Sequence, residues 1–311
     1  MIVTALVALV IGLVVLVQAA DHFVLGAARV AGRTSLTPVV VGAVVLGFGT
    51  SAPELLVSGL AARQGDAALG IGNIVGSNIA NLSLVLGAAA LLARLPLPGN
   101  AIRREAPMAI GAGLVFAVVV QGGVSRIEGL VLLVLMIGAL AWLLLTSGSD
   151  EILAEVDEDA GSLSVEATRT GVALVATLVG ARLVVWGAGS LADAIGMSKG
   201  FVGLTIVAIG TSLPELVTVI AAARRRETGL IVGNLLGSNL FNSLSVGAVV
   251  GLLGDGQAAG TAVAVTGAAV MVAVSLVALL FMVTQRVVVR WEGVVLLGLY
   301  AATLTTVGAA P

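Results

Sequence analysis

Two glutamates are the residues of this sequence whose surroundings point most directly to chemistry. Glu54 and Glu215 each end a six-residue segment that combines a glycine, two hydroxyl side chains, a proline and a carboxylate. The two copies read Gly49-Thr50-Ser51-Ala52-Pro53-Glu54 and Gly210-Thr211-Ser212-Leu213-Pro214-Glu215. Both lie in apolar stretches long enough to cross a membrane, where an ionisable side chain is costly and marks a candidate functional site. Because proline donates no backbone N–H and clashes with the preceding turn, each helix must break beside its glutamate.

Further polar side chains are spaced so that they can join the two glutamates. In the apolar stretch after each glutamate, polar residues recur at every fourth position and therefore share one helix face. They are Asn73, Ser77 and Asn81, and then Asn234, Ser238 and Asn242. The candidate ligands are the carboxylates of Glu54 and Glu215, the amide oxygens of Asn81 and Asn242, the hydroxyls of Thr50, Ser51, Ser77, Thr211, Ser212 and Ser238, and the backbone carbonyls that the helix breaks would free near Gly47 and Ala208.

This candidate set offers oxygen ligands alone, which is typical of a site for a hard cation. Calcium takes about 6–8 oxygens in flexible geometry, whereas magnesium keeps several waters and zinc or copper favours histidine or cysteine. Taken one at a time, the hydroxyl and amide side chains fit cross-helix bonding equally well. Asn73, Asn78, Asn234 and Asn239 fit a supporting role as well as they fit a ligand role. The sequence predicts a metal site for transported cations and no prosthetic group.

The two glutamate segments belong to an internal repeat. Residues 41–85 align with residues 202–246 at a constant offset of 161 and without a gap, and 19 of the 45 pairs are identical. The identities include the GTSxPE and GN-x-x-GSN-x-x-N patterns, which unrelated apolar helices do not share. The sequence therefore predicts a duplication, and matched breaks in two halves of one chain are typical of a transporter binding site.

Composition places the chain in a membrane. Of its 311 residues, 59% are hydrophobic and 10% charged, against about 25% charged in an average soluble domain. Apolar stretches predict ten membrane spans, at 3–28, 37–62, 67–92, 105–122, 127–146, 168–192, 200–223, 228–253, 258–284 and 289–308. Cysteine is absent, and the net charge of −2 indicates no nucleic-acid partner. The apolar N-terminus has no basic residue before Asp21, so we expect no cleaved signal peptide.

These spans predict an all-α membrane protein built from two inverted five-helix repeats, with helices 2 and 7 broken. Five is an odd number, so the second half must enter the membrane from the opposite side. The repeats are residues 1–146 and 167–311, and an acidic linker at 147–166 joins them as a solvated tether. Connections on the linker's side carry eleven basic residues and those on the other side three. The positive-inside rule then places the linker in the cytoplasm and both termini outside it.

The GTSxPE and GSN-x-x-N signatures resemble the two alpha repeats of the cation/calcium exchanger superfamily, and its sodium/calcium branch more than its proton-coupled branch. The resemblance covers the whole ten-span plan. It implies antiport of sodium against calcium across a prokaryotic plasma membrane, with spans 1 and 6 sliding over a fixed core. It also implies that Glu54 and Glu215 are ligands shared by both ions. Thr50, Ser51, Ser77, Thr211, Ser212 and Ser238 would line flanking sodium sites, with carbonyls from Gly47 and Ala208.

One position departs from that resemblance and leaves alternatives open. Members of the sodium/calcium branch often carry an aspartate where this chain has Asn242. A proton-coupled or monovalent cation antiporter on the same scaffold is therefore the alternative function, and a membrane scaffold or sensor is a third. No nucleophile–base pair, phosphate loop or nucleotide motif supports an enzyme. The expected partners are calcium, sodium, protons under the alternative, and the lipid bilayer, with no obligate protein partner.

Overall fold

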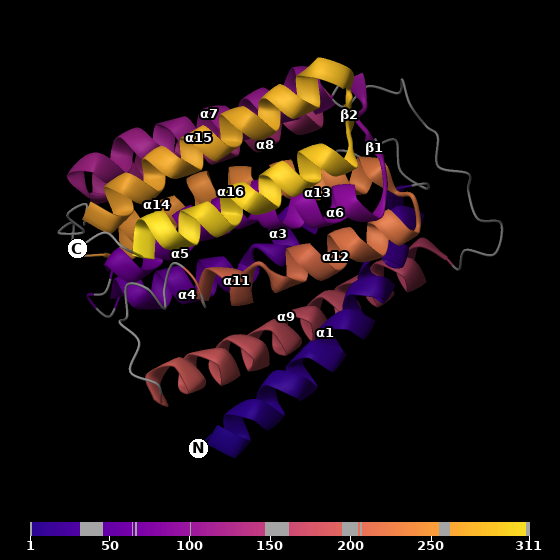
Figure 1. The fold of residues 1–311 in the computed structure, drawn as a ribbon, viewed down its shortest axis with the longest axis horizontal. Coiled ribbons are helices and arrows are strands. Elements are labelled where there is room, and N and C mark those ends of the chain that lie inside the picture. Colours follow the sequence, from indigo (N-terminus) through magenta and orange to yellow (C-terminus); the bar gives the residue numbers. More distant parts are fainter. Residues whose placement is uncertain are drawn as a thin grey trace.

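The part of the protein that the structure describes is a bundle of helices with one short two-stranded ribbon at its edge (Figure 1). The computed structural model describes residues 2–31, 46–63, 65, 67–99, 101–146, 162–194, 205, 207–254 and 262–308. In the first half of the chain the elements are α1 (Ile2–Ala31), α3 (Gly47–Thr50), α4 (Ala52–Arg63), α5 (Ala67–Ala80), η2 (Asn81–Val85), α6 (Leu86–Leu92), β1 (Leu95–Pro96), η3 (Ala101–Glu105), α7 (Ala106–Val119), η4 (Val120–Gly122) and α8 (Arg126–Leu145).

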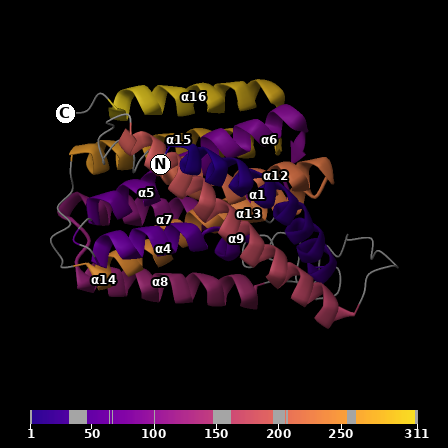
Figure 2. The same cartoon turned by 90° about the horizontal axis from the view of Figure 1, so that it is seen from below.

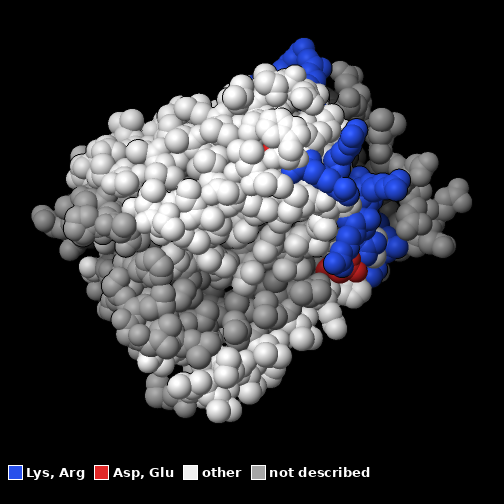
Figure 3. All heavy atoms as spheres, in the orientation of Figure 1, with Lys and Arg blue, Asp and Glu red and all other residues white. Residues whose placement is uncertain are grey.

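The second half repeats this order of long, broken and continuous helices. Its elements are α9 (Leu163–Ala194), α11 (Ala208–Thr211), α12 (Leu213–Arg224), α13 (Thr228–Phe241), η6 (Asn242–Val246), α14 (Gly247–Leu253), α15 (Ala262–Gln285), β2 (Val287–Val288) and α16 (Arg290–Gly308). Strand β1 pairs with β2 in antiparallel register, Leu95 opposite Val288. Lys and Arg side chains gather at the end of the molecule where this ribbon lies (Figure 3).

Within the described residues, six helical segments are long and apolar enough to cross a membrane. They are Ala67–Leu92, Ala101–Gly122, Arg126–Leu145, Leu163–Gly180, Thr228–Leu253 and Val265–Gln285. Two of them coincide with the predicted spans 67–92 and 228–253. Residues 37–45 and 200–204 of the predicted spans 2 and 7, and residues 147–161 of the predicted linker, lie outside the described residues.

The two segments Ala67–Leu92 and Thr228–Leu253 form the centre of the bundle. Each is 83% buried over its most apolar window, against 22% for Arg126–Leu145 at the periphery. Both central segments pass through a π-helical turn, η2 and η6, which begins at Asn81 in one and at Asn242 in the other. The sequence analysis did not anticipate these turns, which widen the helix and frequently occur at functional sites.

The predicted helix breaks occur beside both glutamates. Helix α3 ends at Thr50 and α4 begins at Ala52, and Ser51 between them leaves the helical conformation with φ −80° and ψ 1°. Ser212 separates α11 from α12 in the same way, with φ −83° and ψ 2°. Each proline therefore occupies the first turn of the second helix, where its missing N–H costs no hydrogen bond.

Helices α1 and α9 lie side by side on one flank of the bundle (Figures 1 and 2). They approach closely at Gly26, where a Cβ atom would lie 2.3 Å from the Thr170 hydroxyl oxygen. Helix α9 begins at Leu163, before the predicted span 168–192, and so includes Glu166, which the sequence analysis placed in the linker. An acidic side chain stabilises the first turn of a helix, and Glu166 also pairs with Arg29 of α1 at 3.2 Å.

Candidate cation-binding site

The structure brings the twelve predicted site residues together around the two helix breaks. Helix α3 of the first half packs on α13 of the second, and α11 of the second half packs on α5 of the first. The side chains of the site are at most 3% exposed; they are Thr50, Ser51, Glu54, Ser77, Asn81, Ala208, Thr211, Ser212, Glu215, Ser238 and Asn242. Gly47 is buried as well. The duplicated sequences thus meet each other in space at their most polar residues.

Hydroxyl groups join the two halves in a crosswise pattern. The Thr50 and Ser238 hydroxyl oxygens lie 3.3 Å apart, and so do those of Ser77 and Thr211. These two contacts are related by the repeat, because 161 residues separate Thr50 from Thr211 and Ser77 from Ser238. The site therefore lies on the boundary between the halves, where a movement of one half against the other would alter it.

The two carboxylates at this boundary have no basic partner within the described residues. One oxygen of Glu54 accepts a bond from the Ser212 hydroxyl at 3.5 Å, while Oε2 has no partner. Neither oxygen of Glu215 accepts a hydrogen bond. Hydroxyls of Ser77 and Thr211 lie beside Glu54. A buried carboxylate without a compensating charge is strongly destabilised, so this geometry calls for a bound cation or a proton.

Serine and asparagine oxygens at the site lack hydrogen-bond partners, as the carboxylate oxygens do. The buried oxygen atoms concerned are Ser51 Oγ, Glu54 Oε2, Asn81 Oδ1, Glu215 Oε1 and Oε2, and Asn242 Oδ1. Buried polar atoms normally have hydrogen-bond partners. A cluster of buried oxygens without partners therefore indicates that a bound ligand is the missing partner. Among the described residues, His, Cys, Asp and Glu side chains nowhere gather in threes. A cation here would be held by two carboxylates and by neutral oxygens.

The carbonyls of Gly47 and Ala208 are hydrogen-bonded in the structure, whereas we expected the helix breaks to leave them free. The Gly47 carbonyl accepts a bond from the Ser51 N–H at 3.2 Å, and the Ala208 carbonyl one from the Ser212 N–H at 3.0 Å. Each short helix closes its last turn before the chain bends, which satisfies these carbonyls. Each carbonyl also accepts a second bond, that of Gly47 from the Ser238 hydroxyl at 3.4 Å and that of Ala208 from the Thr211 hydroxyl at 3.3 Å. An ion contact at either carbonyl would therefore have to displace a hydroxyl.

A network of asparagines supports the ligands, and the sequence only partly revealed it. Asn81 donates to the Asn239 side-chain oxygen at 3.0 Å, and Asn239 donates to the Asn78 carbonyl at 3.2 Å. Asn78 in turn donates to the Ser243 hydroxyl at 2.8 Å. The spacing had left Asn78 and Asn239 ambiguous, and in the structure both bond to other groups of the protein.

Two serines of this network were missed by the sequence analysis. Ser58 accepts a bond from Asn73 at 3.1 Å, and Ser243 accepts from Asn78. Their counterparts at the offset of 161 are Val219 and Leu82. Because the repeat does not duplicate these hydroxyls, its pattern carried no signal for them.

A cavity of about 600 Å³ leads from the surface toward the site. Its walls come from α4, α5, α9 and α11, and include exposed Leu60 and Trp186 and fully buried Thr211. Arg182 lines the same cavity and is exposed. One side of the site is thus approached by a hollow between α4 and α9.

Comparison with known proteins identifies relatives over nearly the whole chain. The model of the sodium/calcium exchanger protein family matches residues 4–145 and, separately, residues 169–308. An uncharacterized membrane protein of Methanocaldococcus jannaschii is 35% identical over 296 residues, which are 95% of either chain. Inner membrane protein YrbG of Escherichia coli is 36% identical over 263 residues, or 80% of either chain. Sodium/calcium exchanger MaX1 of Methanosarcina acetivorans is 29% identical over 95% of this chain and 96% of its own.

Solved structures show the same fold. The sodium-calcium exchanger NCX_Mj, in crystals soaked with Na⁺ and Sr²⁺, superposes with a TM-score of 0.84 at 34% identity. A structure of the same exchanger soaked with Na⁺ and Ca²⁺ gives a TM-score of 0.84 at 33% identity. Both alignments cover 98% of this chain and 99% of the other.

Proposed function

The chain belongs to the sodium/calcium exchanger protein family, and we propose that it is a secondary active antiporter that exchanges Na⁺ for Ca²⁺. It is an integral membrane protein, as its apolar helices and its relatives indicate. The observation that carries the proposal is the pair of fully buried carboxylates, Glu54 and Glu215, without a basic partner among the described residues. Two negative charges surrounded by neutral oxygens match one Ca²⁺ or two Na⁺ in turn.

In this proposal the predicted ligand set keeps its roles. Glu54 and Glu215 bind both ions, with the amide oxygens of Asn81 and Asn242 between them. The hydroxyls extend the site on either side for Na⁺; they are Thr50, Ser51, Ser77, Thr211, Ser212 and Ser238. Carbonyls of Gly47 and Ala208 complete the coordination. The orphaned oxygens support this assignment, and the crosswise contacts support ion binding at the boundary between the halves.

The proposed architecture is ten spans in two inverted repeats, 1–146 and 167–311, in a prokaryotic plasma membrane. Separate matches of the family model to each half support the duplication. The name of the Escherichia coli relative, an inner membrane protein, supports the location. The gathering of basic side chains at one end supports an orientation with that end and the linker in the cytoplasm (Figure 3).

Calcium uptake into proteoliposomes tests the function directly. Vesicles holding the purified chain and loaded with Na⁺ should take up ⁴⁵Ca²⁺ when diluted into K⁺ medium, and should not when loaded with K⁺. A pH gradient in place of the Na⁺ gradient should drive no uptake. Uptake driven by the pH gradient alone would establish the proton-coupled alternative, and failure of both gradients would refute cation exchange.

A further inference from the structure

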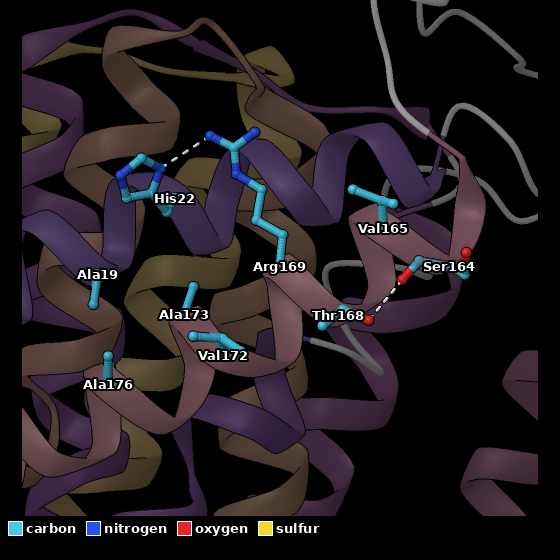
Figure 4. Close-up of a pocket in the computed structure, with 9 residues that line it drawn as sticks. All are labelled: Ala19, His22, Ser164, Val165, Thr168, Arg169, Val172, Ala173 and Ala176. Carbon is cyan, nitrogen blue, oxygen red and sulfur yellow. Dashed lines mark hydrogen bonds between the residues drawn. The ribbon is translucent and has the colours of Figure 1, made fainter.

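A second hollow lies between α1 and α9, away from the predicted ion site. Its volume is about 670 Å³, and the described residues that line it come from these two helices (Figure 4). The lining residues are Ala19, His22, Ser164, Val165, Thr168, Arg169, Val172, Ala173 and Ala176. It combines one cationic side chain and two hydroxyls with an apolar floor, and the exchange mechanism uses none of these residues.

Arg169 is the charged group of this hollow, and no described carboxylate pairs with it. The acidic side chains nearest along α1 and α9 are already engaged elsewhere. Glu166 pairs with Arg29 at 3.2 Å, and both oxygens of Asp21 accept from Arg225 at 2.9 Å. A guanidinium carries five N–H donors, and among the described residues the hydrogen-bond partner of Arg169 is His22.

His22 holds the guanidinium over the hollow without neutralising it. The Arg169 Nη2 and His22 Nδ1 atoms lie 3.1 Å apart, and Figure 4 shows the guanidinium turned toward the imidazole. Because arginine only donates, Nδ1 is the acceptor in this contact. The contact fixes Arg169 in place and leaves its positive charge and its remaining donors available.

The rest of the hollow is apolar and opens outward. Val165 and Val172 are 56% and 66% exposed on α9, and the small side chains of Ala19, Ala173 and Ala176 line the floor. In a membrane protein such a surface contacts lipid chains. Arg169 lies toward the N-terminal end of α9, the end at which basic side chains gather. The polar part of the hollow therefore lies near the headgroup level of one leaflet.

We propose that this hollow binds an anionic phospholipid. The phosphate accepts hydrogen bonds from the Arg169 guanidinium, and one acyl chain lies along Ala19, Val172 and Ala176. Basic pockets between membrane helices recognise anionic headgroups in this way. A soluble anion would satisfy Arg169 but leave the apolar floor uncovered, whereas a lipid satisfies both. Since the described lining residues belong to α1 and α9, the lipid would bridge these two helices.

Native mass spectrometry of the full-length protein tests the proposal. The detergent-purified chain is incubated with equal amounts of phosphatidylglycerol and phosphatidylcholine, and bound lipid is counted. We expect retention of phosphatidylglycerol to exceed that of phosphatidylcholine about tenfold, as a charge-assisted hydrogen bond allows. Arg169→Gln should bring the two lipids close to parity. Arg286→Gln is the matched control, because it removes an exposed arginine beside β2, at the same end of the molecule, and should keep the preference.

Three further results decide the matter. If the Arg169→Gln protein does not elute as a folded species, His22→Lys replaces it, since a second cation in the hollow should increase phosphatidylglycerol retention. An unchanged preference in Arg169→Gln or His22→Lys overturns the proposal. Displacement of the lipid by millimolar inorganic phosphate would show a site for the phosphate group alone, which also contradicts a lipid site.

Discussion

At the scale of single residues, the exchange site depends on a charge that the described protein does not balance. Glu54 and Glu215 are fully buried, and the hydroxyls and amides around them are neutral. Neutral oxygens can complete the coordination of a cation, but they cannot compensate its charge in a low-dielectric interior. The two carboxylates must therefore supply most of the binding free energy for a divalent ion.

Neutralising either carboxylate should abolish calcium exchange. We expect Glu54→Gln and Glu215→Gln each to reduce Na⁺-driven Ca²⁺ uptake by at least about a hundredfold, because a buried charge that loses its partner costs about 3–5 kcal/mol. Glu227→Gln, which changes a half-buried carboxyl outside the site, is the control and should remain active. Ca²⁺ should raise the melting temperature of the control but not of the two site variants. Uptake at half the normal rate in either site variant would exclude it as an essential ligand.

The sequence predicted the residues of this site better than the bonds among them. Duplication of GTSxPE and GSN-x-x-N singled out residues that the fold brings together, since an unusual polar residue repeated at one offset is a strong signal. It could not assign Asn78 and Asn239, because an asparagine offers donors and acceptors whose partners depend on helix rotation. Ser58 and Ser243 have no duplicate, so only the folded arrangement reveals them.

At the scale of elements, the site requires the broken helix of one half to touch the central helix of the other. A Cβ atom on Gly47 would lie 2.9 Å from the Gly237 carbonyl carbon and the Ser238 nitrogen, so α3 and α13 are in backbone contact there. At the corresponding position of the second half, Ala208 already carries a methyl group and is fully buried. The two halves are alike in sequence but differ in how closely these helices approach.

Gly47→Ala should therefore disturb the site although it removes no ligand atom. The added methyl group would push α3 from α13, at a cost of about 1–3 kcal/mol for overpacking. We expect exchange to fall about tenfold with a lower melting temperature, while Ala208→Gly, which removes a methyl at the matched position, retains most activity. Transport assays and thermal unfolding of both variants provide the measurement. A fully active Gly47→Ala protein of normal stability would contradict this close approach.

The helices on the flank show the same asymmetry between halves. Arg225, the residue that caps the C-terminus of α12, binds both oxygens of Asp21 on α1. The matching region between α9 and α4 is a cavity of about 600 Å³. The residue of α9 at the offset of 161 from Asp21 is Arg182, an opposite charge that lines this cavity. The α1–α12 side is closed by an ion pair, and the α9–α4 side is open.

Breaking the Asp21–Arg225 pair should shift the protein away from this arrangement. The pair is partly exposed, with the Asp21 and Arg225 side chains 53% and 35% accessible. We therefore expect its loss to change the rate of thiol labelling in the cavity only about twofold. The chain has no cysteine, which makes Leu60→Cys in the cavity a single reporter for an impermeant thiol reagent. Asp21→Asn should slow its labelling, and the exchanged pair Asp21→Arg with Arg225→Asp should restore the rate. If the exchanged pair labels as slowly as Asp21→Asn, the ion pair has no such role.

Hydropathy predicted the ends of helices correctly where the helix is uniformly apolar. Where polar contacts set the end of a helix, the predicted and observed boundaries differ. The predicted central spans 67–92 and 228–253 have the same bounds as the helical segments of the structure, Ala67–Leu92 and Thr228–Leu253. Helix α9 begins before the predicted residue 168 because Glu166 forms an ion pair with Arg29 of α1. A hydropathy pattern contains no information on such a pair. The π turns at Asn81 and Asn242 have no pattern in apolar periodicity, and only the backbone shows them.

At the scale of the whole molecule, the proposed inverted repeat makes a firm prediction about sidedness. Ile2→Cys and Glu155→Cys, made separately in the cysteine-free chain, report the N-terminus and the linker. In right-side-out vesicles an impermeant reagent should label the first and not the second, because eleven of the basic residues assigned to connections lie on the linker's side. Inside-out vesicles should give the reverse. If Glu155→Cys alone is labelled in right-side-out vesicles, the protein has the opposite topology to the one proposed.

The net charge that crosses the membrane in each exchange cycle depends on the charge of the same site. The predicted ligands carry two negative charges, because Asn81 and Asn242 are both neutral. Two Na⁺ or one Ca²⁺ neutralise them, while a third Na⁺ would leave an uncompensated positive charge at low dielectric, which is costly. We therefore expect nearly electroneutral exchange, and Na⁺-driven Ca²⁺ uptake that barely responds to membrane potential.

Vesicles with a potential clamped by K⁺ and valinomycin measure this response. Asn242→Asp supplies a third carboxylate, and should make uptake voltage-dependent by admitting a third Na⁺. Asn242→Ser, which keeps the site neutral there, is the control and should stay insensitive to voltage. Uptake by the unaltered protein that changes with potential as a three-for-one exchange requires would show that neutral oxygens alone can hold the extra Na⁺. The two buried carboxylates would then set the affinity of the site without setting its stoichiometry.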